Sequence, residues 1–148
     1  MGSRLDYWEV VPELFGELVT ITRRLKAGRL AGTLIELVFL RCSQINGCAH
    51  CIDNHARALR ALGESEQRLD CLVAWRDAPF FDARERAALA FAEAMTRIGE
   101  AGVPEPVWQE ARARFDDQEL AELAFAVVVI NAWNRLSIGF AQAPKPRG

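Results

Sequence analysis

The stretch that decides the fold covers residues 33–62 and reads TLIELVFLRCSQINGCAHCIDNHARALRAL. Its first part, Leu34 to Leu40, is apolar apart from Glu36, a pattern that is typical of a helix buried on all sides. The pair Asn46-Gly47 then breaks the helix. A second helical pattern begins directly after this pair. We therefore expect two helices that pack against each other across a short turn.

Helical periodicity continues through the rest of the chain, and no strand pattern is present. Asp82 with Glu85, and Asp116 with Glu119, have the spacing of capping boxes at helix starts. The expected helices cover residues 12–27, 33–45, 48–62, 65–75, 82–99, a short segment around Trp108, and 117–138. The sequence thus predicts one compact all-α domain of about six to seven helices over residues 1–148. Its core should lie at about 15–140, followed by a flexible, proline-rich tail at 141–148.

Composition excludes several classes of protein. Apolar residues make up 51% and charged residues 26% of the chain, which is typical of a globular domain and argues against disorder. The net charge of −2 comes from 18 basic and 20 acidic residues, and the basic ones are not gathered into one segment. Because a nucleic-acid site needs a basic face, we expect no nucleic-acid partner.

The longest apolar stretch, residues 123–130, lies in the last helix. It is much shorter than the ~20 residues that span a bilayer, and no secretory leader pattern is present. We therefore expect a cytoplasmic protein without a membrane partner, and a last helix that is central to the core or to a subunit interface. We expect core or interface positions for five aromatic residues and for two thiols on apolar faces: Trp75, Phe91, Trp108, Phe125, Trp133, Cys42 and Cys71.

A pair of cysteines and a histidine share one helix face. Cys48 and Cys51 are three residues apart, and His55 follows four residues later. In a reducing compartment, such a close pair is more typical of redox or metal chemistry than of a structural disulfide. The helix start favours a thiolate at Cys48, whereas the spacing of four residues favours Cys51 as the partner of His55. These arguments leave open which thiol attacks.

Glu36 is the other unusual residue of this region. It lies twelve residues before Cys48, on a helix that the short turn can fold back alongside the second one. The carboxylate could then orient His55 or accept its proton, and burial should raise its pKa toward neutrality. An ion pair with Arg41 or Arg57 is the structural alternative.

Zinc binding is a second interpretation of the cluster. Four ligands could come from Cys48, Cys51 and His55 together with Cys42 or His50. We favour redox chemistry, because structural zinc usually takes its ligand pairs from separated segments. His50 faces another side of the helix and is a second-tier candidate that could adjust the pKa of the thiols.

Together, Glu36, Cys48-x-x-Cys51 and His55 resemble the signature of alkylhydroperoxidase D-like proteins, which belong to the carboxymuconolactone decarboxylase superfamily. The resemblance covers about residues 15–140 and is strongest over 36–63. Residues 131–136 also resemble a late helical segment of small members. Its polar side chains could reach the site, but packing, capping or ion pairing is the simpler role for Asn131, Asn134 and Arg135.

The resemblance implies an all-helical fold that assembles into a homo-oligomer (a dimer, trimer or hexamer) and a thiol-dependent peroxidase without cofactor or metal. It implies that Cys51 attacks the hydroperoxide and becomes a sulfenic acid, and that Cys48 resolves it to a Cys48–Cys51 disulfide. His55 and Glu36 would carry the protons, and a thiol or lipoyl-type partner would supply the electrons. A disulfide reductase or redox sensor, or a zinc-stabilised helical module, is the alternative function.

Overall fold

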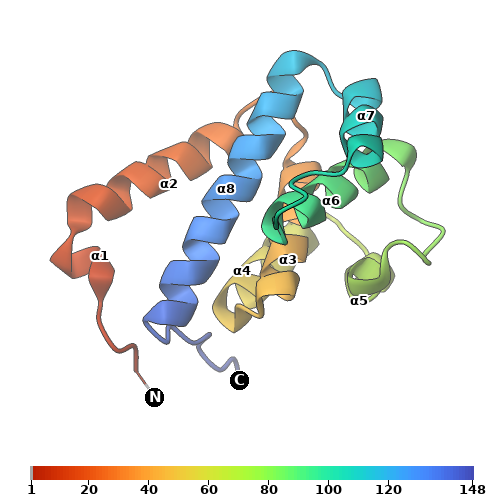
Figure 1. Ribbon diagram of the computed structural model, residues 1–148. Helices are drawn as coiled ribbons and strands as arrows, with labels where there is room; N and C mark the ends of the chain where they lie inside the picture. Colours follow the sequence, from red (N-terminus) through yellow and green to blue (C-terminus); the bar gives the residue numbers. More distant parts are fainter. Residues whose placement is uncertain (1) are drawn as a thin grey trace.

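Eight α-helices and one 3₁₀-helix make up residues 2–148, the part of the chain that the computed structural model describes (Figure 1). In chain order they are α1 (Tyr7–Val10), α2 (Pro12–Lys26), α3 (Gly32–Asn46), α4 (Ala49–Ala61), α5 (Glu66–Cys71), η1 (Leu72–Ala74), α6 (Ala83–Thr96), α7 (Glu105–Arg114) and α8 (Asp117–Gly139). No strand occurs among these residues, so the all-α prediction is confirmed. The expected number of six to seven helices is too low, because the short α1 was not foreseen.

Helix α3 lies at the centre of the molecule. Every residue from Leu34 to Ser43 is buried, since α4, α6 and α8 pack around this helix. One core cluster joins α3 to α6, α7 and α8, and a second joins α3 to α4, α5, η1 and α6. Helix α2 lies along α8, away from α6 and α7 (Figure 1). The uniformly apolar sequence of α3 thus explains its position, and it places Glu36 in the interior.

The turn between α3 and α4 has the geometry that its sequence predicts. Gly47 has a φ of 71°, in the left-handed region that glycine adopts without strain. The backbone N–H of Cys48 donates to the carbonyl of Ser43 at 3.0 Å, which closes the end of α3. Helix α4 therefore returns along α3, and the start of α4 lies beside the end of α3.

Two predicted helix ends are wrong by a few residues, whereas both predicted capping boxes are present. Helix α6 ends at Thr96 instead of 99, because the next large apolar side chain, Ile98, is exposed and anchors no further turn. Helix α5 ends at Cys71 and continues as the tighter η1 instead of reaching residue 75. The indole of Trp75 then turns inward, and its Nε1 donates to Glu93 at 2.9 Å.

Helix α8 is both a core helix and a surface helix. By length and composition alone, it is the one helix among residues 2–148 that could span a membrane, but it packs against α2, α3, α6 and α7. Phe125 and Val128 face outward and are 60% and 57% exposed. Phe125 is therefore not a core residue. Trp108 is also exposed, in contrast to the buried Trp75 and Phe91.

The described segments before α1 and after α8 lie close together below α8 (Figure 1). The backbone N–H of Arg4 donates to the carbonyl of Phe140 at 2.7 Å, and the rings of Tyr7 and Phe140 stack 5.2 Å apart. These contacts hold α1 in place, although α1 is too short to show a helical period in the sequence. The tail after α8 contains no helix or strand, and its Arg147 pairs with Asp53 on α4.

A buried ion cluster connects α3, α6 and the segment that follows η1. The carboxylate of Glu93 is 4% exposed and accepts from Nε of Arg41 at 2.7 Å and from the indole of Trp75. Arg76 forms a further ion pair with the same carboxylate. Burial alone would raise the pKa of Glu93, but these donors outweigh it and hold the pKa below its ordinary value of 4.5. Glu93 is thus an ionised group on which three helical segments depend.

Candidate active site

The cysteine pair lies at the start of α4. Cys48 is the N-cap residue, and Cys51 is the third residue of the helix. The two form a disulfide, with their Cα atoms 5.3 Å apart. The backbone N–H of Cys51 also points at Sγ of Cys48, 3.3 Å away. The unpaired N–H groups of a helix start favour negative charge, so a reduced thiol here is in a position that stabilises a thiolate.

Glu36 and His55 are in direct contact, as the sequence suggested. Oε2 of Glu36 lies 2.7 Å from Nδ1 of His55, and both side chains are largely buried. The other oxygen, Oε1, pairs with Nζ of Lys26 at 2.6 Å. The alternative partners named above are excluded, since Arg41 binds Glu93 and Arg57 donates to Asn54.

The expected rise in the pKa of Glu36 is wrong. Burial does act to raise it, but the hydrogen bonds and charges of His55 and Lys26 outweigh burial, and the pKa lies below its ordinary value of 4.5. An ionised carboxylate can only accept hydrogen bonds, so Nδ1 of His55 carries a hydrogen toward it. The Nε2 atom is then left to exchange a proton on the side away from Glu36. Glu36 therefore orients His55 and does not serve as a neutral acid.

This lowered pKa predicts a change in acid stability. The ionised Glu36 stabilises the folded protein above about pH 4.5, and that stabilisation is lost as the pH falls through the lower folded-state value. The Glu36→Gln variant should be about 1–2 kcal/mol less stable at pH 7, because a charged hydrogen bond is lost and exposed Lys26 is solvent-screened. Below pH 4.5 its free energy of unfolding should fall less steeply than that of the wild type.

Urea unfolding followed by circular dichroism at a series of pH values measures this difference. Glu17→Gln, at an exposed position of α2, is the matched control and should leave the profile unchanged. Parallel profiles for the wild type and Glu36→Gln would show that the carboxylate is not held ionised by its partners.

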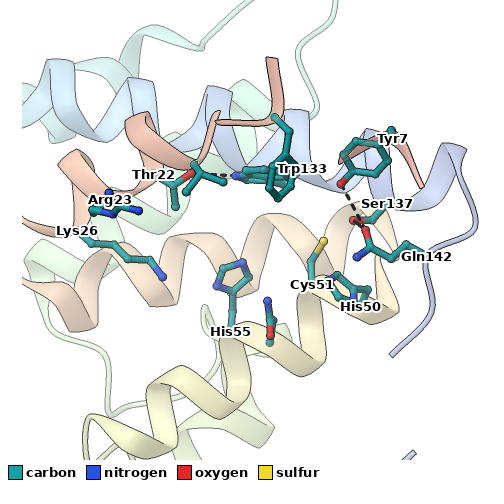
Figure 2. A pocket seen from close by; sticks show the side chains of 13 residues that line it. Tyr7, Thr22, Arg23, Lys26, His50, Cys51, His55, Trp133, Ser137 and Gln142 are labelled. Atoms are coloured by element: carbon teal, nitrogen blue, oxygen red, sulfur yellow. Dashed lines mark hydrogen bonds between the residues drawn. The ribbon is translucent and has the colours of Figure 1, made fainter. Parts of the chain in front are cut away.

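A cavity of about 420 Å³ opens onto Cys51 and His55 (Figure 2). It lies between α2, the start of α4 and the last turns of α8. The indole of Trp133 forms part of its wall, held by a hydrogen bond from Nε1 to Oγ1 of Thr22 at 2.9 Å. Figure 2 shows the sulfur of Cys51 turned toward this space. Cys51 and His55 thus line the same open cavity.

His50 also lines this cavity, although its position on the helix predicted a different direction. Burial is the main cause that lowers its pKa below 6.5, and the charge of Asp53 opposes it only in part. A neutral imidazole therefore lies next to Cys51 at neutral pH. The second-tier assignment of His50 stays a prediction, now with a place in the cavity wall.

The remaining cysteines are separate from this site. Cys42 is buried, accepts a hydrogen bond from Oγ1 of Thr96 at 3.2 Å, and has a pKa raised by burial to about 11. Cys71 is only half-buried, less than expected. Among residues 2–148, no group of three or more His, Cys, Asp or Glu side chains has an arrangement that could hold a metal ion. The geometry of these residues therefore offers zinc no preformed site.

The polar residues of α8 hold the turn that carries the cysteines. Nδ2 of Asn46 donates to the side-chain oxygens of both Asn131 and Asn134 at 2.9 Å. Asn134 in turn donates to Oγ of Ser43 at 2.9 Å. Asn131, Asn134 and Arg135 do not line the cavity. The packing role for Asn131 and Asn134 is thus confirmed, and Arg135 donates to Asn131.

Sequence reasoning missed the contribution of α2. Lys26 is the last residue of α2 and pairs with Glu36 in the second turn of α3. A five-residue connection joins the two helices, so the sequence did contain a signal that these charges meet. Arg23 and Trp133 carry no such signal, because the packing of α2 on α8 alone brings them to the cavity.

The amino-acid sequence is similar to those of a known protein family and of a curated protein. The sequence profile of the carboxymuconolactone decarboxylase family matches residues 11–94. The uncharacterized protein YdfG of Bacillus subtilis is 37% identical over 138 residues, which cover 93% of this chain and 94% of YdfG.

Solved structures share the fold. A protein of unknown function from Agrobacterium tumefaciens, whose name refers to the antioxidant defence protein AhpD, superposes with a TM-score of 0.92 at 36% identity. The match covers 97% of this chain and 99% of that protein. The debrominase Bmp8 is 17% identical and superposes with a TM-score of 0.78, so it shares the fold alone. The match covers 88% of this chain and 70% of the Bmp8 chain.

Proposed function

Since this chain belongs to the carboxymuconolactone decarboxylase family and has an AhpD-like fold, we propose that it is a thiol-dependent peroxidase that reduces hydroperoxides. One observation carries the proposal. Cys51, half of a cysteine pair at a helix start, lines a cavity together with His55, whose Nδ1 is held by Glu36. Cys48 does not line that cavity, which supports Cys51 as the attacking thiol.

The proposed cycle uses these groups in two steps. The thiolate of Cys51 attacks the terminal peroxide oxygen, the O–O bond breaks, and the leaving alkoxide takes a proton from His55 to give an alcohol and Cys51 sulfenic acid. Cys48 then attacks the sulfenic sulfur, which forms the disulfide and releases water. Two electrons have passed from the thiol pair to the peroxide. An external dithiol, of the lipoyl class or another, returns the disulfide to two thiols.

The assembly and location belong to the same proposal. We place the protein in the cytoplasm as a homo-oligomer, a dimer, trimer or hexamer. Exposed apolar side chains on two neighbouring helices, Leu14 of α2 and Phe125 and Val128 of α8, support association with further copies.

Trapping of the sulfenic acid tests the division of labour between the cysteines. The reduced Cys48→Ser variant should form a dimedone adduct on Cys51 after one equivalent of cumene hydroperoxide, because no resolving thiol remains. The reduced Cys51→Ser variant should form none on Cys48. Mass spectrometry of the peptide that contains both positions measures the adduct, and an adduct on Cys48 alone would contradict the assignment.

Assays of the wild-type protein separate the peroxidase from a disulfide reductase. A peroxidase consumes hydroperoxide at a rate that depends on added dithiol. A disulfide reductase instead reduces a protein disulfide, such as those of insulin, and leaves hydroperoxide intact. The second result would replace the proposed function.

A further inference from the structure

The cavity beside Cys51 has an uneven distribution of charge. Thirteen residues line it, and they include two cations, Arg23 and Lys26, but no aspartate or glutamate. Both cations belong to the last turn of α2, at the end of the cavity away from Tyr7 and Gln142 (Figure 2). The cavity is therefore electropositive at one end.

The two cations differ in what they already bind. Nζ of Lys26 pairs with Glu36 at 2.6 Å, so its charge is balanced inside the protein. Arg23 is an exposed residue, and its guanidinium forms no side-chain hydrogen bond or ion pair among residues 2–148, so its five N–H donors are available to a ligand. A planar guanidinium fits the two oxygens of a carboxylate.

One part of the cavity wall is apolar. The ring of Phe15 meets Trp133 edge to face, with ring centroids 5.6 Å apart, and Val19 lies on the same side of α2. Trp133 is also held by its hydrogen bond to Thr22. A flat apolar group fits such a wall better than a polar one.

We infer that the substrate of this site is an anionic hydroperoxide, with an aromatic or short apolar body and a carboxylate that binds Arg23. The inference rests on the proposed function, because it places the peroxide of that substrate at Cys51. The volume of about 420 Å³ lies within the range of small-molecule sites, roughly 300–1,000 Å³. The carboxylate takes no part in the chemistry, so the two-electron reduction to the alcohol proceeds as described above.

A pair of hydroperoxides that differ only in charge tests this inference. The probes are the tertiary hydroperoxide of 4-isopropylbenzoic acid and that of its methyl ester, each reduced with dithiothreitol as electron donor. The wild type should show a kcat/KM roughly three- to tenfold higher for the acid, a ratio expected for one charged hydrogen bond at an exposed side chain. The Arg23→Gln substitution should lower kcat/KM for the acid alone, so that the ratio falls to near one.

Arg24→Gln is the matched control, since it removes the same charge from the next residue of α2, which does not line the cavity. It should keep the preference for the acid. A wild type without preference, or an Arg23→Gln variant that loses the acid and the ester equally, would overturn the inference. The latter result would mean that Arg23 acts on the thiolate.

Binding of inert products keeps this test independent of turnover. The alcohols that correspond to the two probes, 4-(2-hydroxypropan-2-yl)benzoic acid and its methyl ester, can be titrated into the reduced Cys51→Ser protein by calorimetry. Tighter binding of the acid, weakened roughly three- to tenfold by Arg23→Gln but not by Arg24→Gln, would support the ligand class even if no peroxide were reduced. Peroxide reduction without any charge preference would leave the proposed function and remove this inference.

Discussion

The Cys51→Ser variant is expected to lose at least about a thousandfold in kcat/KM for hydroperoxide reduction. A serine hydroxyl in this position is a far weaker nucleophile and cannot form a sulfenic acid or a disulfide. The helix start, His55 and Cys48 remain, but Cys48 does not line the cavity and so does not replace Cys51 as the attacking thiol. A coupled assay with excess dithiol and cumene hydroperoxide measures the loss, with all proteins fully reduced beforehand.

Cys71→Ser provides the control for this substitution. Cys71 is a free thiol on α5 outside the cavity, so its removal should change kcat/KM by less than twofold. Equal thermal unfolding of reduced Cys51→Ser and reduced wild type would show that the loss is chemical. Retention of more than a tenth of wild-type turnover in a folded Cys51→Ser protein would contradict the cysteine mechanism.

The Glu93→Ala variant is expected to lose about 3–5 kcal/mol in its free energy of unfolding, because it leaves a buried charge without its partner. Arg41 is 7% exposed, and its Nε would face an empty space where the carboxylate was. The indole N–H of Trp75 would lose its acceptor at the same time. Urea unfolding at pH 7, followed by tryptophan fluorescence and circular dichroism, measures the change.

An exposed ion pair serves for comparison. Glu66 pairs with Arg60 on the surface of α5 and α4, at a geometry as short as that of the buried pair. Water screens this pair, so Glu66→Ala should leave the unfolding curve unchanged. If Glu93→Ala were as mild as Glu66→Ala, the cluster around Glu93 would not be a folding determinant.

The order of the helices was readable from the chain because each of its signals is local. Capping boxes, prolines and the Asn46-Gly47 pair act within one or two turns, and the structure confirms the helices that they delimit. The missed α1 and the end of the shortened α5 lack such signals. Contacts with α8 and with Glu93, which are distant in sequence, decide their form.

The contact of Glu36 with His55 was predictable for the same reason, since only one short turn separates their helices. The pKa of Glu36 was not, because its direction depends on two opposing contributions. Burial was visible in the apolar sequence around Glu36, whereas the pairing with Lys26 was recognised only in the folded structure. Burial alone predicts a raised pKa for Glu36, and the direction of that prediction was therefore wrong.

The sequence by itself therefore determined the set of helices, the cysteine pair at a helix start and the histidine one turn beyond it. Helical spacing relates these groups to one another without a contribution from any other part of the chain. Only the tertiary structure decided which surface faces the sulfur. Helix α2 and the end of α8 are over a hundred residues apart along the chain, yet they meet above Cys51 and bring Arg23 and Trp133 to its cavity. The contact between these two helices depends on apolar packing. Because apolar packing is non-directional, it leaves no characteristic residue spacing in the sequence from which the contact could be predicted.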